Sequence, residues 1–295
     1  ENPYFTNEIN KITENFVLIM NEVKNKNIEL IKKLFNIISE AISGYLFHKS
    51  YNEHKNFDRV KNYFTFLKES NEKIYEKDII KIKKLGDDYT NNVYLIYHTE
   101  TQKLFAMKLY FYDEKSDELY KRELLNYYNI NNPLFPKYYG KTSYFENKAI
   151  IIEYIEGKPL SKISEMNFNR ENKLKSVFQI MIGLKYFYQH DYIYRDLKPD
   201  NIFIINKKGS ICIIDFDRMI SKDHESKTKD FQHKYVAPEC FEDKKITTKA
   251  DIYSLGVIIN DIFYDEFQND ESEEYKELHE MCERCTQYYP NKRPT

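Results

Sequence analysis

Hydrophobic residues in the first seventy positions recur at steps of three and four. That spacing places side chains on one face of an α-helix. Three such stripes are present, separated by the polar stretches KNKN and KSYN. The stripes consist of Ile9, Ile12, Phe16, Ile19 and Val23, then Ile28, Ile31, Phe35, Ile38, Ala41 and Tyr45, then Phe57, Val60, Phe64 and Leu67. Because an amphipathic helix cannot bury its stripe alone, the pattern predicts a small helical bundle over residues 1–72.

From about Ile79 the pattern changes to short runs rich in β-branched and aromatic residues, which are typical of strands. The runs are DIIKIKKLG, NNVYLIYH, KLFAMKLYFY, YYGKTSYFE and KAIIIEYIE. A helix is expected between the third and fourth runs, from about Leu119 to Ile130. After Gly157 the pattern is mainly helical, interrupted by two short strands, IFII and SICIID. The sequence therefore predicts an α+β fold with a five-stranded small lobe and a mainly helical large lobe.

Composition narrows the function classes. The chain has 295 residues, is 41% hydrophobic and carries a net charge of −2. The near-balanced charge argues against nucleic acid as a partner and against electrostatic binding to a membrane. Apolar runs such as FVLIM are far too short to span a bilayer. Four scattered cysteines do not form a disulfide framework, so a reducing, cytoplasmic location is expected.

One segment concentrates chemically useful side chains. RDLKPDN, from Arg195 to Asn201, holds two carboxylates, two cations and an amide. CIIDFDRM follows it and places Asp215 after an apolar run. Upstream, FAMK ends in Lys108 and KRELL contains Glu123. Downstream come YVAPE and DIYSLGV.

These motifs, in this order and on these element types, resemble the eukaryotic protein-kinase family of Ser/Thr type. The resemblance covers about Glu76 to Thr295 and implies a two-lobed kinase domain over residues 76–295, preceded by the helical extension. It also implies an ion pair between Glu239 of the APE motif and Arg293 of NKRPT. The final helix of that fold is expected to be absent, since the sequence ends after NKRPT.

The resemblance assigns roles to four residues in phosphoryl transfer. Asp196 would orient the substrate hydroxyl and accept its proton, and Lys198 would lie near the transferred phosphate. Lys108 would hold the α- and β-phosphates, while Glu123 fixes Lys108 through an ion pair.

The same resemblance implies ATP and Mg²⁺ as cofactors. Asn201 and Asp215 would supply oxygen ligands to the metal, which prefers such hard donors. The residues implied to surround the nucleotide are Gly86, Val93, Ala106, Lys108, Glu153, Ile155 and Phe203.

Several parts of the chain depart from the family pattern. The phosphate-covering loop reads GDDYTNNV, in which only Gly86 remains of three glycines and Asp88 occupies one glycine position. A carboxylate there would repel phosphates unless it points to solvent, so weaker nucleotide binding is expected. Asp217 replaces the glycine of Asp-Phe-Gly, and would either restrict rotation of that segment or supply a further metal ligand. Tyr194 replaces the usual histidine and is expected to pack against Phe216.

The leading hypothesis is an active enzyme that phosphorylates Ser/Thr hydroxyls of protein substrates. Lys198 favours this class, because tyrosine kinases usually carry Ala or Arg in that neighbourhood. The alternative is a pseudokinase, or a weakly active kinase, that acts as an interaction module through its helical extension. Those helices would then bind a partner or a second copy of the chain. Small-molecule kinases of the same ancestry are a third class, which usually lacks the APE segment.

Overall fold

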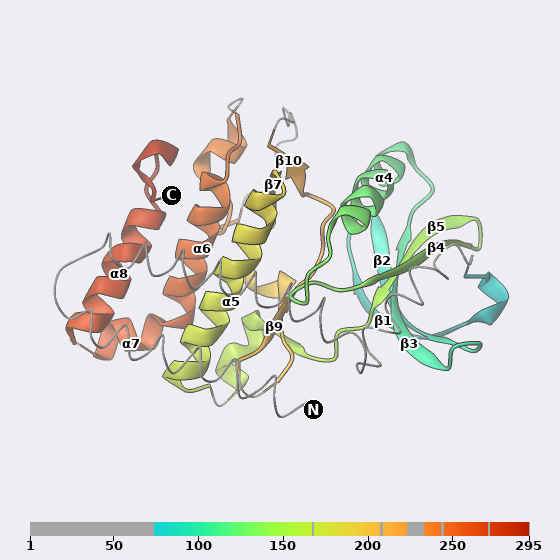
Figure 1. Cartoon of the computed structure of the whole chain (residues 1–295), viewed down its shortest axis with the longest axis horizontal. Helices are drawn as coiled ribbons and strands as arrows, with labels where there is room; N and C mark the ends of the chain where they lie inside the picture. The colour runs from blue at the N-terminus through green and yellow to red at the C-terminus, as the bar shows by residue number, and fades with distance from the viewer. Residues whose placement is uncertain are drawn as a thin grey trace, which may run out of the picture. The chain divides into compact units, whose positions relative to one another are not determined.

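The computed structural model describes residues 74–166, 168–206, 209–222, 233–242, 245–270 and 272–294. The helical bundle predicted over residues 1–72 lies outside these residues. Within the described part, a β-sheet with one flanking helix forms one lobe and a group of helices forms the other (Figure 1). The predicted two-lobed α+β architecture is confirmed for this part of the chain.

The small lobe contains a five-stranded antiparallel sheet in the order β1-β2-β3-β5-β4. Its strands are β1 (Ile79–Asp87), β2 (Asn91–His98), β3 (Lys103–Tyr110), β4 (Tyr138–Tyr144) and β5 (Asn147–Glu153). A short 3₁₀ helix, η1 (Glu76–Asp78), precedes β1. β3 and β5 are central and contribute buried residues such as Met107, Ile150 and Ile151, whereas β1 is an edge strand with mostly exposed side chains. All five strands lie where the apolar runs predicted them.

Helix α4 (Glu114–Asn129) packs beside this sheet against β3 and β5 (Figure 1). It begins five residues earlier than the expected Leu119. The reason is an N-cap, because the Asp113 side chain accepts hydrogen bonds from Ser116 N (2.8 Å) and Ser116 Oγ (2.6 Å). The first turn is polar and carries no apolar stripe, so hydrophobic periodicity alone placed the start of the helix too late.

The large lobe is mainly helical. Its helices are η2 (Leu160–Glu165), α5 (Arg170–Gln189), η3 (Pro199–Asn201), η4 (Pro238–Phe241), α6 (Lys249–Ile262), α7 (Tyr264–Asn269), α8 (Glu273–Cys285) and η5 (Pro290–Lys292). Its core includes the fully buried Phe187, Phe216 and Phe263. Gly256 allows α6 and α8 to approach closely, because a Cβ atom there would lie 2.6 Å from Cys285 Cβ.

Short strand pairs hold the loops between these helices. They are β6 (Lys158–Pro159), β8 (Ile202–Ile204) and β9 (Ile211–Ile213) in one sheet, and β7 (Tyr192–Ile193) with β10 (Ile220–Ser221) in another. β8 begins directly after Asn201, and β9 ends two residues before Asp215. A hydrogen bond from Ile214 N to Asn201 O (2.9 Å) joins the two loops. The predicted catalytic residues therefore lie on neighbouring, tied segments.

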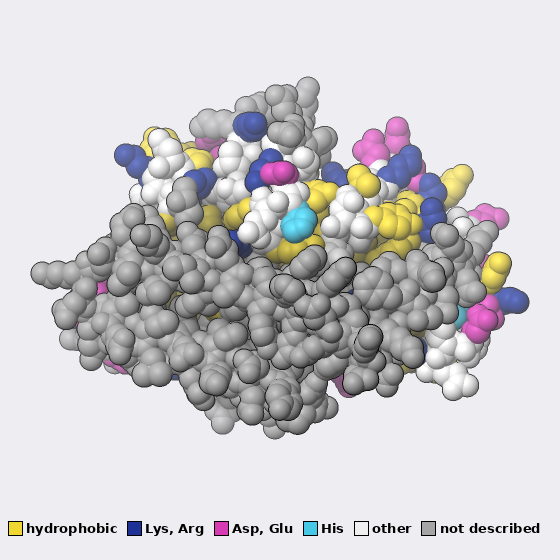
Figure 2. Space-filling model, viewed as in Figure 1, with side chains coloured by type: hydrophobic (Ala, Val, Ile, Leu, Met, Phe, Trp, Pro, Cys, Tyr) yellow, Lys and Arg dark blue, Asp and Glu magenta, His cyan; other side chains and the backbone are white. Residues whose placement is uncertain are grey.

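The described surface is mixed in charge, and the cysteines are unpaired thiols. On the face drawn in Figure 2, the described Lys and Arg side chains are interspersed with Asp, Glu and hydrophobic ones rather than gathered by sign. All four cysteines lie in the described residues, and each is a buried free thiol. Among the described helices, none has the length and apolar character needed to cross a bilayer.

Candidate active site

Lys108 connects the two lobes through two ion pairs. Its Nζ lies 2.8 Å from Glu123 Oε2 on α4 and 2.7 Å from Asp215 Oδ1 after β9. The Glu123 side chain is fully buried, and it also accepts a hydrogen bond from the Tyr110 hydroxyl. Burial would lower the pKa of Lys108, but the charges of Asp215 and Glu123 outweigh it and hold that pKa well above its ordinary value. Lys108 is therefore a fixed cation at the junction of the lobes.

Three carboxylates converge beside this lysine. Oxygen atoms of Asp196, Asp215 and Asp217 lie within 4.8 Å of one another. Burial raises the pKa of Asp215, yet Lys108 reverses the effect and leaves that pKa below its ordinary value. Burial, followed by the charge of Asp215, raises the pKa of Asp217 to about 8. The site thus contains an ionised Asp215 beside an acid that holds its proton far more tightly.

Among the described residues, hydrogen bonds reach one of the two carboxylate oxygens of Asp196. Its Oδ2 accepts hydrogen bonds from Lys198 Nζ (2.7 Å) and Asn201 Nδ2 (2.7 Å). Its Oδ1 is buried and accepts no hydrogen bond within the described ranges, although Arg218 Nε lies 3.8 Å away. A buried acceptor without a donor costs free energy, so it marks a place where a ligand group can bind.

The loop that carries Asp196 is fixed by Asp251, whose role the sequence interpretation missed. Asp251 Oδ2 accepts from Tyr194 N (3.0 Å), and its Oδ1 accepts from Arg195 N (2.8 Å). Arg195 has φ of 69° and Asp215 has φ of 68°, values uncommon outside glycine. Burial raises the pKa of Asp251 to about 6, and the hydrogen bonds from the two backbone amides oppose that rise. The strained backbone at Arg195 and Asp215 persists only where the surrounding structure holds it.

Two further residues of α4 were also missed. Asn126 Nδ2 donates to Phe216 O (2.8 Å) and Met219 O (3.2 Å), and Arg122 Nε donates to Asp217 O (2.5 Å). These bonds attach the segment after Asp215 to the helix that carries Glu123. The acceptors are backbone carbonyls, which leave no pattern in the sequence.

The aromatic residues around this segment confirm one prediction. Tyr194 meets Phe216 edge to face, with ring centroids 6.3 Å apart and planes at 74°. It also stacks on Phe187 at 5.3 Å, and its hydroxyl donates to Ile214 O (2.5 Å). Tyr194 therefore packs in the core in place of the usual histidine, and its hydroxyl group has a hydrogen-bond partner.

The predicted nucleotide-binding residues lie on adjacent strands. Val93 on β2 pairs with Lys108 on β3, and Ala106 of β3 pairs with Ile152 of β5. Ala106 is buried, whereas Val93 is partly buried. Glu153 ends β5 and its amide donates to Lys137 O (2.8 Å).

The other predicted residues on this side sit next to these strands. Ile155 lies two residues after β5, outside regular structure, and is partly buried. Phe203 is the partly buried centre of β8 and pairs with Pro159 of β6.

The β1–β2 turn is exposed and polar. Gly86 pairs with Val93, and a Cβ atom at Gly86 would meet nothing within 4 Å. Asp88 is exposed; its N–H donates to Asn91 O (2.9 Å), and its Oδ1 accepts from Tyr89 N (2.5 Å). The Asp88 carboxylate therefore closes the turn locally.

The predicted pair at the end of the chain is confirmed. Arg293 donates to Glu239 in a bidentate arrangement, from Nη1 to Oε1 (2.6 Å) and from Nη2 to Oε2 (2.8 Å). Both residues are buried. Nearby, a hollow of about 510 Å³ lies on the large lobe, between the segment before η4 and α6. Its lining includes none of the predicted catalytic, metal-binding or nucleotide-binding residues.

Comparison with known proteins agrees with this geometry. Residues 79–295 match the protein kinase domain. The chain is 29% identical over 198 residues to the serine/threonine-protein kinase STE7 homolog of Candida albicans (strain WO-1), covering 63% of this chain and 33% of that protein. It is 28% identical over 207 residues to mitogen-activated protein kinase kinase 2 of Arabidopsis thaliana (65% and 55%). It is 27% identical over 223 residues to the Aurora kinase of Dictyostelium discoideum (71% and 56%). The matched region thus spans a third to about half of these relatives.

Proposed function

Since the chain belongs to the protein kinase family, we propose that it transfers the γ-phosphate of ATP to Ser or Thr hydroxyls of protein substrates with Mg²⁺ as the metal. The observation that carries this proposal is the buried network in which Lys108 binds both Glu123 and Asp215. It places a cation from the small lobe against a metal-ligand candidate from the large lobe. The oxygen donors beside this network would hold the metal ion and accept the proton of the substrate hydroxyl.

The residues present fit a magnesium ion. Asp215, Asp217 and Asp196 bring carboxylate oxygens within 4.8 Å of one another, and Mg²⁺ prefers oxygen donors. Asp215 and Asn201 are the proposed ligands, and Asp217 is positioned close enough to add a third. When bound, the metal neutralises charge on the phosphates and holds them in line with the attacking oxygen.

The chain's own residues would prepare and position the reactants. Asp196 Oδ1, buried and without a hydrogen-bond donor in the described residues, can accept the proton of a substrate hydroxyl. Lys198, held 2.7 Å from Asp196 Oδ2, places its positive charge where a transferred phosphate would approach. Lys108 would hold the remaining phosphates once Asp215 exchanges its lysine contact for the metal.

A catalytically weak interaction module remains the second candidate, and Asp88 is the observation that favours it. Asp88 puts a carboxylate into the turn that should cover the phosphates, and that turn has lost two glycines. The two candidates differ in one measurable respect. A weak binder of ATP still transfers phosphate when ATP saturates it, whereas a pseudokinase does not.

Phosphoamino-acid analysis tests the substrate class directly. The purified chain is incubated with labelled ATP, Mg²⁺ and a mixed protein substrate, beside the Asp196→Asn variant. Labelled phosphoserine or phosphothreonine from the wild type alone supports the proposal. Labelled phosphotyrosine as the main product would overturn the Ser/Thr assignment, and equal labelling by both proteins would overturn the role of Asp196.

A further inference from the structure

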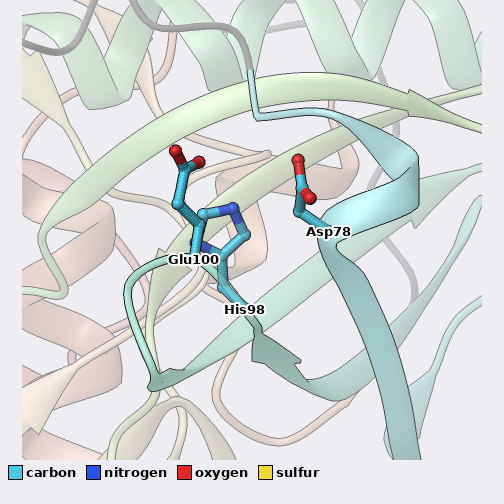
Figure 3. A group of neighbouring side chains, drawn as sticks. All are labelled: Asp78, His98 and Glu100. Carbon is cyan, nitrogen blue, oxygen red and sulfur yellow. The ribbon is translucent and has the colours of Figure 1, made fainter.

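A second group of side chains that could hold a metal ion lies at the opposite end of the small-lobe sheet from the proposed phosphoryl-transfer site. It consists of Asp78 at the end of η1, His98 at the end of β2 and Glu100 in the following turn (Figure 3). One ligand atom of each residue lies within 4.8 Å of the others. Along β2 and β3, the His98–Lys103 pair lies five residue steps from the Val93–Lys108 pair, about 17 Å of strand. The group is therefore separate from the site around Lys108.

Backbone pairing fixes the relative positions of the three residues. Ile79 pairs with His98 at the first position of the β1–β2 ladder, which places Asp78 beside the end of β2. Thr99 N donates to Asp78 O (2.9 Å) and ties the turn to η1. Two separate segments of chain thus bring their side chains to one point.

His98 is oriented as a metal ligand requires. The residue is only 5% exposed, and its ring packs edge to face on Phe105. Its Nδ1 lies 2.9 Å from Thr101 Oγ1 and accepts a longer hydrogen bond from Thr101 N (3.4 Å); with Nε2 bound to a metal, Nδ1 would instead donate to Thr101 Oγ1. No hydrogen bond within the described ranges reaches Nε2, and one ring nitrogen points toward the space between the two carboxylates (Figure 3). Metal-binding histidines usually make such a bond with the nitrogen that does not bind the ion.

The two carboxylates also have no cationic partner among the described residues. None of the ion pairs found among the described residues involves Asp78 or Glu100. Two converging carboxylates repel each other. A divalent cation would offset this repulsion and would use all three donors at once.

We propose that Asp78, His98 and Glu100 form a binding site for a zinc-class divalent cation, with Thr101 orienting the histidine. One imidazole and two carboxylates suit Zn²⁺, which accepts three protein ligands with water in the fourth position. Bonds of about 2.0–2.2 Å hold ligand atoms closer together than 4.8 Å, so a small rotation of the exposed Glu100 side chain completes the site.

Such an ion would join the start of β1 to the β2–β3 turn. β1 is an edge strand held by β2 alone, and its pairing with β2 contains two register irregularities. A metal link at one end would stabilise this pairing. The expected role is therefore structural, at the beginning of the kinase domain.

The test is zinc titration of the whole purified chain after treatment with a chelator. Isothermal calorimetry compares the wild type with His98→Gln, Glu100→Gln and Thr101→Val. His279→Gln serves as the matched control, because that histidine is exposed on α8 and distant in sequence from the group. Glu100 is also exposed, so Glu100→Gln retains the fold even if replacement of the buried His98 does not.

We expect His98→Gln to remove one zinc equivalent and Thr101→Val to weaken binding about 10- to 100-fold. Glu100→Gln should weaken it at least as much, and His279→Gln should match the wild type. Cobalt substituted for zinc should give visible absorption typical of four-coordination, and His98→Gln should abolish it. Equal stoichiometry and affinity in the wild type, His98→Gln and Glu100→Gln would overturn the proposal.

Discussion

The β1–β2 turn and the network around Lys108 face the same proposed substrate but are built in opposite ways. In the network, Lys108, Glu123 and Asp196 are buried and each side chain is held by a charged partner. In the turn, Asp88 and Tyr89 are exposed, and the two hydrogen bonds of Asp88 are local to the turn. The network retains every charged residue that the family resemblance requires, whereas the turn has lost two of three glycines.

The network acts through charged side chains, whereas the turn acts through backbone amides. A buried charge needs its partner, because an unpaired one costs several kcal/mol, about 3–5 when one member of a buried pair is removed. Each member of the network therefore fixes the others. A loop that covers the phosphates acts mainly through its backbone amides. A substitution in that loop therefore weakens nucleotide binding but does not remove a catalytic group. We therefore expect substitutions in the network to abolish turnover and substitutions in the turn to alter ATP affinity.

The largest effect is expected for Asp215→Asn. This change removes a proposed metal-ligand charge and the partner of Lys108 at 2.7 Å, with little change in volume. Turnover at saturating ATP should fall by about 10²-fold or more, while the circular dichroism spectrum stays unchanged. Asp191→Asn is the matched control, since the Asp191 side chain is 76% exposed. Equal loss in both variants would contradict the assignment.

Glu123→Gln should have the next largest effect. Gln keeps the shape of the side chain but withdraws the charge that fixes Lys108 from α4. We expect kcat/KM to fall about 10- to 100-fold, which corresponds to ~1.4–2.7 kcal/mol. Glu118→Gln, an exposed position on the same helix, should behave as the wild type. An unaffected Glu123→Gln enzyme would mean that Asp215 alone positions the lysine.

Asp217 should give the stability of the metal-free protein a pH dependence. Its pKa is about 8 in the folded chain, above the ordinary value of 3.8. Between about pH 4 and 8 the folded state then binds a proton that the unfolded state has released. The contribution of Asp217 to the free energy of unfolding is therefore full below pH 4 and falls as pH rises to 8.

Urea unfolding in the presence of a chelator measures this dependence. The stability of Asp217→Asn relative to the wild type should rise steadily from pH 4 to pH 8. A constant difference across that range would show that Asp217 is ionised throughout.

The smallest effect is expected for Asp88→Gly. The exposed carboxylate lies in a turn beside the proposed phosphate site, and water and salt screen its charge. ATP affinity should rise by about two- to fivefold at low salt, roughly 0.4–1 kcal/mol, and the gain should shrink at high salt. A gain in ATP affinity of two orders of magnitude would show that the turn matters as much as the network, which would contradict the difference described above.

The sequence predicted the strands and the charged side chains of the site better than it predicted features that depend on backbone groups. Short runs rich in β-branched and aromatic residues located all five strands of the small lobe, and in β3 and β5 these runs coincide with consecutive buried positions. Ordered charged motifs indicated Lys108, Glu123 and Asp196. The start of α4 was missed, since Asp113 caps a polar first turn.

The supports of the site were missed for a different reason. Asn126 binds the backbone carbonyls of Phe216 and Met219, and Asp251 binds two backbone amides. Backbone groups are the same in every residue, so the sequence does not indicate which polar side chain will meet them.

The central claim is that the buried network is a working phosphoryl-transfer centre despite the altered turn. It is tested most directly by the rate of magnesium-dependent phosphate transfer at increasing ATP, for the wild type and Asp196→Ala. We predict a wild-type rate that saturates only at high ATP, falls to background without magnesium, and is about 10²-fold or more above that of Asp196→Ala. A wild-type rate that stays at the level of Asp196→Ala even at saturating ATP would contradict the account and identify the chain as a pseudokinase.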